Sequence, residues 1–321
     1  MSKILVTGGA GFIGSQTVKK LLGLGHQVTT VDNLNDYYSP ELKKDRLKQL
    51  KDYQNFKFFE LDIANKNDLK EVFQKNQFEV ICHLAAQAGV RYSFENPEAY
   101  QKANLEGTFN LLEMAKDYEI KNFVFASSSS VYGNSNQDYF SEVDNTDSPV
   151  SLYAATKKAG ELLISFYHQS FGINSLALRL FTVYGPWGRP DMAYFKFAQA
   201  ILNNQPIDVY NQGKHQRDFT YIDDIVDGFV KAIEFNQSNQ GFEIINLGNS
   251  KPVELEYFIT TLESLLGKKA IKNYQPMQPG DVLKTSANIE KAKRLLSWQP
   301  TTSIEEGLEK FVAWFKTYYQ K

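Results

Sequence analysis

Tyr153 and Lys157 stand four residues apart in a segment whose pattern predicts a helix, so their side chains share one helix face. A free phenol has a pKa near ~10 and is a weak base at neutral pH. A cation beside it favours the phenolate and lowers that pKa toward the pH at which acid–base catalysis works best. Four consecutive serines, Ser127 to Ser130, precede the pair and can hold or relay the proton of a substrate alcohol. Together these residues predict proton transfer at an alcohol, although a Tyr and a Lys at this spacing also occur on ordinary amphipathic helices.

The first residues of the chain predict a strand, a glycine-rich turn and a helix. The turn satisfies G-x-G-x-x-G through Gly9, Gly11 and Gly14, and G-x-x-G-x-x-G through Gly8, Gly11 and Gly14. They permit a tight turn and close approach of the backbone to a pyrophosphate, which the N–H groups at the helix start then face. A second predicted strand, 27–31, ends in Asp32, whose carboxylate can bind a ribose 2′-OH and would repel a 2′-phosphate. The pattern predicts a dinucleotide site that prefers NAD to NADP.

Composition limits the other possibilities. The 321 residues are 42% hydrophobic and 22% charged with a net charge of −2, which is ordinary for a globular protein and favours neither nucleic-acid nor membrane binding. No apolar run approaches the ~20 residues of a membrane span. The single cysteine, Cys82, lies in an apolar run and is expected to be a buried thiol, and the four histidines lack the spacing of metal ligands. We expect a cytoplasmic protein without a metal site.

Short apolar runs alternate with helical patterns through the first half of the chain. The predicted strands are 3–7, 27–31, 56–60, 79–84, 121–127 and 174–179, and the predicted helices are 12–24, 40–51, 66–76, 97–117 and 151–171. Such alternation is typical of βαβ units that build a Rossmann-type, doubly wound parallel sheet with helices on both faces. Ligands of such sheets bind at the carboxyl ends of the strands, which is where Asp62, residues 85–87 and the serine run are expected.

After about residue 180 the pattern changes to loops rich in Gly, Pro, Trp and Tyr between shorter helices. We therefore expect an NAD-binding domain over 1–180 and a smaller C-terminal α/β substrate-binding domain over 181–321, which would close over the cofactor. The run 242–247 is strand-like and is expected to return to the main sheet.

Several motifs support a more specific assignment. They are Thr7-Gly8-x-x-Gly11-x-x-Gly14, Asp32, Asp62-Ile63, Leu84-Ala85-Ala86, Tyr153-x-x-x-Lys157 and Arg179-Leu180-Phe181-x-x-Tyr184-Gly185-Pro186. Over essentially its whole length the chain resembles the extended short-chain dehydrogenase/reductase family. Four further stretches, 31–38, 87–93, 186–192 and 216–221, together with 279–282, resemble nucleotide-sugar enzymes and most of all UDP-glucuronate 4-epimerases.

The resemblance implies a role for each matching residue. It implies NAD contacts from Gly8, Gly11, Phe12, Ile13, Gly14, Asp32, Asn33, Asp62, Ile63, Leu84, Ala85, Ala86, Tyr153 and Lys157. It implies that Tyr153 is the catalytic base, that Lys157 holds the nicotinamide ribose, and that Ser128 contacts the reacting hydroxyl. It implies UDP-sugar contacts from Arg91, Ser128, Ser129, Ser130, Tyr153, Thr182, Arg189, Val209, Tyr210, Arg217 and Asp281. Of these, Val209 and Tyr210 would lie near the uracil, and Arg217 and Asp281 near the diphosphate and its ribose.

Arg189 is expected by this resemblance to bind the C6 carboxylate of a UDP-uronate. A guanidinium matches a carboxylate in both charge and planar geometry, whereas the alternative is a solvated loop arginine. The implied reaction is oxidation at C4, rotation of a 4-keto sugar in the pocket, and reduction on its other face. Because that intermediate is a β-keto acid, Arg189 would also protect it from losing CO₂ by holding the carboxylate in place.

The residues just before Val131 distinguish this chain from relatives that catalyse other reactions. Sugar 4,6-dehydratases and UDP-glucuronate decarboxylases typically place a carboxylate just before Val-Tyr-Gly, whereas this chain has Ser129 and Ser130 before Val131. UDP-glucose/UDP-galactose 4-epimerases remain the main alternative, and a non-catalytic NAD-binding scaffold stays open because a fold does not fix a function. The resemblance also implies a homodimer through helices near 97–117 and 151–171.

Overall fold

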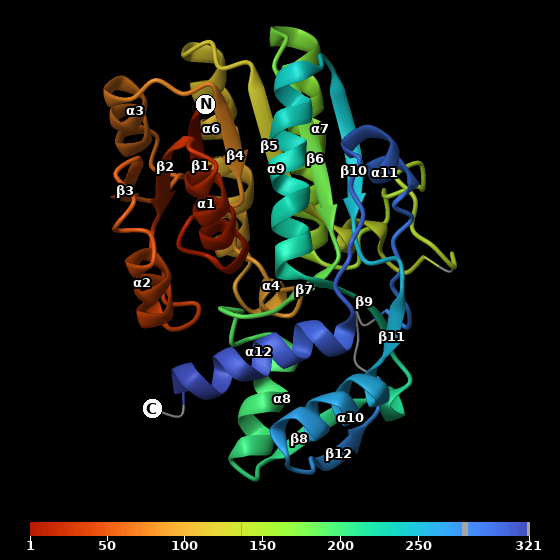
Figure 1. Cartoon of the computed structure of the whole chain (residues 1–321). Helices are drawn as coiled ribbons and strands as arrows, with labels where there is room; N and C mark the ends of the chain where they lie inside the picture. Colours follow the sequence, from red (N-terminus) through yellow and green to blue (C-terminus); the bar gives the residue numbers. More distant parts are fainter. Residues whose placement is uncertain (136, 278–281, 320–321) are drawn as a thin grey trace.

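The computed structural model describes residues 1–135, 137–277 and 282–319 (Figure 1). Its centre is a seven-stranded sheet with the order β10-β6-β5-β4-β1-β2-β3, in which every neighbouring pair is parallel. These strands are β1 (Lys3–Thr7), β2 (Gln27–Asp32), β3 (Phe56–Glu60), β4 (Val80–His83), β5 (Asn122–Ser128), β6 (Asn174–Leu180) and β10 (Phe242–Leu247). The predicted Rossmann-type α/β fold is confirmed. The strand order reverses between β1 and β4, where such sheets bind ligands.

Helices cover both faces of this sheet (Figure 1). On one face α9 (Ile222–Ser238) packs against α1 (Phe12–Gly23), β5 and β6. On the other face α7 (Leu152–Phe171) packs against β5, β6 and α6 (Gly107–Asp117), and α3 (Lys66–Lys75) lies beside α6. The short helix α2 (Pro40–Lys48) follows β2.

The strands divide their side chains between these two helical layers. In β1, Ile4 belongs to the same hydrophobic cluster as Val18 of α1 and Phe229 of α9, whereas the next residue, Leu5, belongs to the cluster that contains Ile164 of α7. Successive strand residues point to opposite faces, so a strand covered on both sides must be apolar throughout. This is why the strands read as continuous apolar runs rather than as alternating patterns.

The helix that carries Tyr153 and Lys157 has defined ends. The hydroxyl of Ser151 accepts a hydrogen bond from the Ala154 N–H at 3.1 Å, which caps the N-terminus of α7. Gly172 ends the helix with a φ of 65°, a left-handed conformation that favours glycine. Helix α7 therefore spans nearly the whole predicted range and presents a rigid face to the end of β5.

The segment predicted as one helix over 97–117 is more complex. It consists of α5 (Pro97–Tyr100), a π-helical turn (Gln101–Glu106) and α6, and a short helix, α4 (Tyr92–Glu95), precedes it. Asn104 of the π-helical turn is buried and hydrogen-bonds to Gln87 and Thr156. These long-range contacts stabilise the wider turn, and no local pattern in the sequence reveals them.

Residues after 180 contribute to both parts of the molecule. Strand β10 and helices α9 and α11 (Glu290–Leu296) pack with the large sheet. The smaller part contains the strands β7 (Thr182–Tyr184), β9 (Gln216–Tyr221) and β11 (Pro252–Glu254), the pair β8 (Pro206–Tyr210) and β12 (Ile271–Gln275), and the helices α8 (Ala193–Leu202), α10 (Leu255–Leu266) and α12 (Ile304–Tyr319). Among the residues described, no helix is both long and apolar enough to cross a membrane.

Candidate active site

A cavity of about 570 Å³ opens at the carboxyl ends of the central strands, where the two parts of the molecule meet. Its lining includes the glycine turn, the ends of β2, β4 and β5, one face of α7, residues 180–183, Arg189 and Met192. Of the residues that the sequence analysis assigned to NAD, all line this cavity: Gly8, Gly11, Phe12, Ile13, Gly14, Asp32, Asn33, Asp62, Ile63, Leu84, Ala85, Ala86, Tyr153 and Lys157. The fold thus brings the dinucleotide motif and the Tyr–Lys pair to one site.

The glycine turn fits a dinucleotide. A β-carbon on Gly14 would lie 2.1 Å from the Gly8 carbonyl oxygen, and one on Gly8, whose φ is 72°, would lie 2.7 Å from the Ala85 nitrogen. Only glycine allows this close packing of turn, helix and neighbouring strand. Helix α1 begins after Gly11 without a side-chain cap, so its N-terminal N–H groups suit an anionic pyrophosphate.

Asp32 sits where an adenosine ribose would be bound. Its carboxylate accepts hydrogen bonds from the Ala10 N–H at 3.1 Å and the Leu34 N–H at 3.0 Å. Burial raises the pKa of Asp32, and the nearby Lys43 ammonium and these two hydrogen bonds oppose the rise. The two backbone bonds fix the carboxylate in the orientation that a ribose hydroxyl donor requires.

Below the cavity, a buried histidine stabilises the strand ends. His83 Nδ1 lies 2.7 Å from the Thr7 hydroxyl, its Nε2 lies 2.9 Å from the Thr108 hydroxyl, and Thr7 in turn accepts the Ala85 N–H at 3.2 Å. Burial, reinforced by the charge of Lys157, lowers the pKa of His83 well below its usual value. His83 is therefore a neutral structural residue that links β1 to β4 under the pocket.

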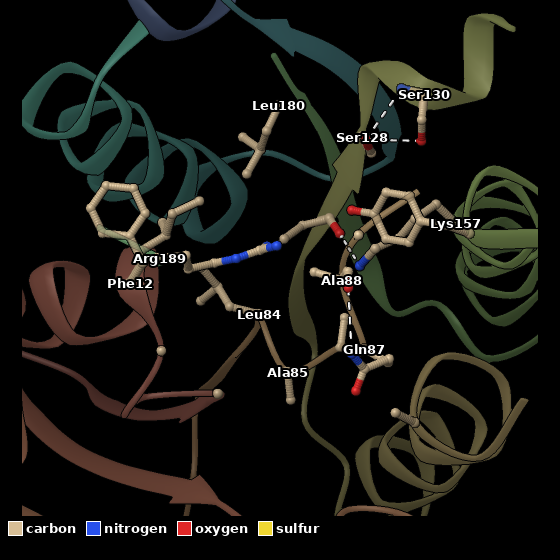
Figure 2. Close-up of a pocket in the computed structure, with 18 of the residues that line it drawn as sticks. Phe12, Leu84, Ala85, Gln87, Ala88, Ser128, Ser130, Lys157, Leu180 and Arg189 are labelled. Carbon is tan, nitrogen blue, oxygen red and sulfur yellow. Dashed lines mark hydrogen bonds between the residues drawn. The ribbon is translucent and has the colours of Figure 1, made fainter. Parts of the chain in front are cut away.

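Lys157 projects from α7 toward the end of β5 (Figure 2), and Tyr153 lies one turn earlier on the same helix and lines the same cavity. The Lys157 ammonium donates a hydrogen bond to the Ala126 carbonyl oxygen at 2.8 Å and lies 4.9 Å from the centre of the Phe125 ring. Burial lowers the pKa of Lys157 to about 7, although the carboxylate of Glu161 opposes the change. The side chain is thus a cation that can lose its proton near neutral pH.

In the protein alone, the pKa of the Tyr153 phenol is not lowered toward neutrality. Burial raises the pKa of Tyr153, whereas a hydrogen bond from Ser128 and the positive charge of Arg189 oppose the rise. The prediction that Lys157 brings this pKa toward neutrality is therefore wrong for the chain by itself. The physical reason is that desolvation of the phenolate dominates and that the Lys157 ammonium is held by a backbone carbonyl of β5.

The serine run divides between two environments. Ser128 faces the cavity, and its oxygen accepts hydrogen bonds from the Ser130 N–H at 3.2 Å and the Ser130 hydroxyl at 3.0 Å (Figure 2). The side chain of Ser127 points away and donates to Glu161 at 2.6 Å. Glu161 also makes a buried bidentate ion pair with Arg179, both of whose bonds measure 2.8 Å. The sequence analysis did not assign this supporting ion pair, whose members come from α7 and β6.

Arg189 also lines the cavity, and its side chain is not solvated. Its Nε donates to one oxygen of Asp191 at 3.0 Å and its Nη2 donates to the other, and the side chain is only 21% exposed. The Tyr37 hydroxyl donates to the same carboxylate at 3.3 Å. These bonds use one edge of the planar fork, and the other edge carries Nη1. The sequence analysis did not predict this pairing.

The remaining residues assigned to the sugar nucleotide are distributed as follows. Those that line the cavity are Arg91, Ser129, Ser130, Thr182 and Arg217. Val209 is fully buried in β8, and the Tyr210 ring lies 5.0 Å from the guanidinium carbon of Arg91. Neither Val209 nor Tyr210 lines the cavity. Asp281 lies outside the described residues.

Comparisons with known proteins agree with this geometry. The sequence profile of the NAD dependent epimerase/dehydratase family matches residues 4–248. An uncharacterized protein of Methanocaldococcus jannaschii is 51% identical, covering 97% of this chain and 95% of that protein. A UDP-glucuronate 4-epimerase of Thermodesulfobacterium geofontis is 47% identical, covering 98% of this chain and 97% of that protein.

Among solved structures, the UDP-glucuronic acid 4-epimerase of Bacillus cereus in complex with UDP-glucuronic acid and NAD superimposes with a TM-score of 0.92. It is 39% identical, and the match covers 99% of this chain and 100% of that one. With the glycine turn, the acidic residue after β2 and the Tyr–Lys pair in one cavity, the chain belongs to the NAD-dependent epimerase/dehydratase family and is an enzyme of its nucleotide-sugar epimerase group.

Proposed function

We propose that this enzyme interconverts UDP-glucuronate and UDP-galacturonate by inverting C4 through a transient 4-keto sugar. The observation that carries the proposal is that a proton-transfer group, Ser128 and Tyr153, shares its cavity with Arg189. Arg189 lies close enough for its charge to influence the phenol of Tyr153. A carboxylate on C5 of a sugar and a hydroxyl on its C4 are separated by one carbon–carbon bond, so both groups can be engaged at once.

The proposed roles at the reacting alcohol follow from the side chains. The Tyr153 phenolate accepts the proton of the C4 hydroxyl, and the Ser128 hydroxyl holds the same oxygen. The residues of the glycine turn would hold NAD, which would supply a hydride acceptor for C4 in the oxidation and a hydride donor in the reduction. Lys157 holds the ribose beside Tyr153, and after the keto sugar has rotated, Tyr153 returns the proton to the C4 oxygen.

Arg189 would provide the selectivity. We propose that its Nη1 edge binds the substrate carboxylate while Asp191 retains the Nε edge. A β-keto acid loses CO₂ most readily when the carbon–carboxyl bond stands perpendicular to the ketone plane, so a guanidinium that fixes the carboxylate away from that orientation suppresses decarboxylation. The loop 186–192 would thus determine both which sugar binds and which product leaves.

Three alternatives have less support. The positions before Val131 hold Ser129 and Ser130, so the carboxylate expected of the dehydratases and decarboxylases is replaced by hydroxyls. A neutral hexose, as in UDP-glucose/UDP-galactose 4-epimerases, would leave the Nη1 edge of Arg189 without an anionic ligand, which is costly in a partly buried site. The Ser128, Tyr153 and Lys157 arrangement also argues against a non-catalytic scaffold.

We also propose a homodimer. The large apolar residues Leu162 and Phe166 of α7 are 60% and 54% exposed, and Phe109 of α6 is 45% exposed, on two helices that pack side by side. Neighbouring exposed apolar side chains on adjacent helices favour a protein interface.

We further propose a cytoplasmic location, which is supported by the single buried thiol of Cys82. We also propose a functional division near residue 180 into an NAD-binding part and a substrate-binding part.

One experiment tests the reaction. Purified protein is incubated with UDP-glucuronate without added cofactor, and the sugar is followed by proton NMR. The proposal predicts UDP-galacturonate and the same final mixture when the reaction starts from either epimer. A pentose product would contradict the role of Arg189. No conversion even with added NAD⁺, combined with turnover of UDP-glucose, would contradict the choice of substrate.

A further inference from the structure

Arg46 of α2 is a fully buried guanidinium that the catalytic mechanism does not use. It donates five hydrogen bonds to uncharged acceptors. Its Nε and Nη2 reach the Trp187 carbonyl at 3.0 and 2.6 Å, and Nη2 also reaches the Gly188 carbonyl at 3.1 Å. Its Nη1 reaches the Ala10 carbonyl at 3.1 Å and the Tyr38 hydroxyl at 2.7 Å. A charge buried in this way is retained only when its hydrogen bonds are satisfied.

The carbonyl acceptors of Arg46 lie in two segments that are assigned to different ligands. Ala10 lies inside the glycine turn, between Gly9 and Gly11, where the pyrophosphate of NAD would bind. Trp187 and Gly188 immediately precede Arg189, where the substrate carboxylate is proposed to bind. Some 140 residues separate Arg46 from that second segment, so this contact is a product of the fold alone.

The segment before Arg189 is held in a strained conformation. Trp187 has a φ of 62°, a left-handed conformation that is unfavourable for a bulky L-residue. Such a residue keeps this conformation only when its surroundings impose it. The Trp187 ring packs 5.3 Å from Trp314 and 5.1 Å from Tyr318 of α12, so the ring is fixed from one side and the carbonyl by Arg46 from the other.

The next residue is equally constrained. A β-carbon on Gly188 would lie 1.9 Å from the Tyr194 hydroxyl, which leaves no room for a side chain. Helix α12 is itself tied to α2, because the Tyr318 hydroxyl donates to Asp45, the neighbour of Arg46 (Figure 1). The backbone immediately before Arg189 is therefore held by α2 and α12, while Asp191 of the same loop holds the guanidinium.

We propose that Arg46 is a positioning residue that joins the dinucleotide turn to the carboxylate-binding loop and, by holding Trp187 and Gly188, directs Arg189 toward the substrate carboxylate. This inference rests on the proposed function, since it assigns Arg46 a share in recognition of a uronate. Arg46 is not among the residues that line the cavity. Its contribution is specific for the acidic sugar and does not extend to the UDP part of the substrate.

Comparing the binding of UDP-glucuronate with that of UDP distinguishes this positioning role from a general role in stabilising the fold. We would measure the dissociation constants of UDP-glucuronate and of UDP, which lacks the carboxylate, by calorimetry in NAD-loaded Tyr153→Phe protein, where turnover is suppressed. Arg46→Lys keeps the charge but loses the planar fork that reaches Ala10 and Trp187 together. Lys44→Met, on the exposed face of the same helix, is the matched control.

The expected result is about 10-fold weaker binding of UDP-glucuronate by Arg46→Lys, with UDP binding changed by less than about 2-fold and no effect of Lys44→Met. The effect of Arg46→Lys on UDP-glucuronate binding is also measured in Arg189→Ala protein. If Arg46 acts through Arg189, Arg46→Lys has an effect of less than about 2-fold there, because coupled residues are not additive. Equal weakening of both ligands, equal weakening in both backgrounds, or no weakening at all would overturn the proposal.

A milder variant covers the case in which Arg46→Lys fails to fold. Tyr38→Phe removes one acceptor of the same guanidinium and leaves the charge in place, and we expect it to weaken UDP-glucuronate binding about 2- to 3-fold with the same dependence on Arg189. Failure of the proposed function would show itself differently. In that case the wild-type enzyme would leave UDP-glucuronate unconverted in the NMR experiment, whatever the binding data for Arg46 variants.

Discussion

The two ends of the cavity are built in different ways. At the alcohol end, Tyr153 and Lys157 lie one turn apart on α7, and Ser128 ends the neighbouring strand β5, so regular secondary structure fixes their relative positions. At the carboxylate end, Arg189 lies in a loop whose conformation depends on residues of α2 and α12. The residues proposed for the chemistry are thus positioned by one helix and one strand, whereas the backbone before the proposed selectivity residue, Arg189, is held by contacts distant in sequence.

This difference determines how amino-acid substitutions affect the positions of the side chains at the two ends. Tyr153 and Lys157 keep their spacing wherever the helix forms, whereas Arg189 is redirected by any change in the residues that hold its loop. The two ends are not electrically independent, because the charge of Arg189 lowers the pKa of Tyr153 against the effect of burial. Occupation of Arg189 by a substrate carboxylate would reduce that influence.

The strongest way to separate the two ends is to remove the phenol hydroxyl. We expect Tyr153→Phe to lower the rate of epimerisation by about 10²–10⁴-fold, since the general base is lost. UDP-glucuronate binding should change by less than about 3-fold, because the carboxylate end is intact. Steady-state kinetics and calorimetry measure the two effects, and a variant with more than a tenth of the wild-type rate would exclude Tyr153 as the base.

The converse change removes the guanidinium at the carboxylate end. We expect Arg189→Ala to weaken UDP-glucuronate binding by about 10–100-fold, the magnitude of a charge-assisted bidentate contact, and to release a pentose product. Arg294→Ala, an exposed arginine of α11, is the control and should match wild type. Unchanged affinity together with an absence of pentose would show that the carboxylate binds elsewhere.

A smaller effect is expected from the carboxylate that holds Arg189. Asp191→Asn weakens the ion pair on the Nε edge and should raise the KM for UDP-glucuronate about 3- to 10-fold, with kcat changed less. Asp208→Asn, at an exposed position of β8, serves as the control. A lower KM would instead mean that Asp191 competes with the substrate for Arg189.

The smallest effect concerns stability at the alcohol end. Because burial lowers the pKa of Lys157 from 10.5 to about 7, the charged form destabilises the folded state, fully below pH 7 and progressively less toward pH 10.5. Lys157→Met should therefore raise the melting temperature of NAD-free protein more at pH 6 than at pH 9, by about 3 °C. A pH-independent difference would mean that the pKa of Lys157 is not lowered.

The motifs at the alcohol end could be predicted from the sequence, whereas the contacts that hold Arg189 and its loop could not. The alternation of apolar runs and helices was sufficient for the parallel sheet, and the glycines, Asp32 and the Tyr–Lys spacing were sufficient to locate the cavity. The support from Arg46 and the π-helical turn around Asn104 were not predicted, because both depend on contacts between residues distant in sequence. The pairing of Arg189 with Asp191, only two residues away, was not predicted either, because it depends on the conformation of the loop. The direction of the pKa of Tyr153 was also missed, since burial is a property of the assembled site.

The central claim is that Arg189 selects an acidic sugar for a catalytic group that would act on any C4 alcohol. The most direct test compares kcat/KM of the wild-type enzyme for UDP-glucuronate and for UDP-glucose, with the same ratio measured in Arg189→Ala. We predict a preference of about 100-fold or more for UDP-glucuronate in the wild type and a collapse of that preference in the variant. Comparable kcat/KM values for the two sugars in the wild type, or a preference that survives in Arg189→Ala, would contradict the account.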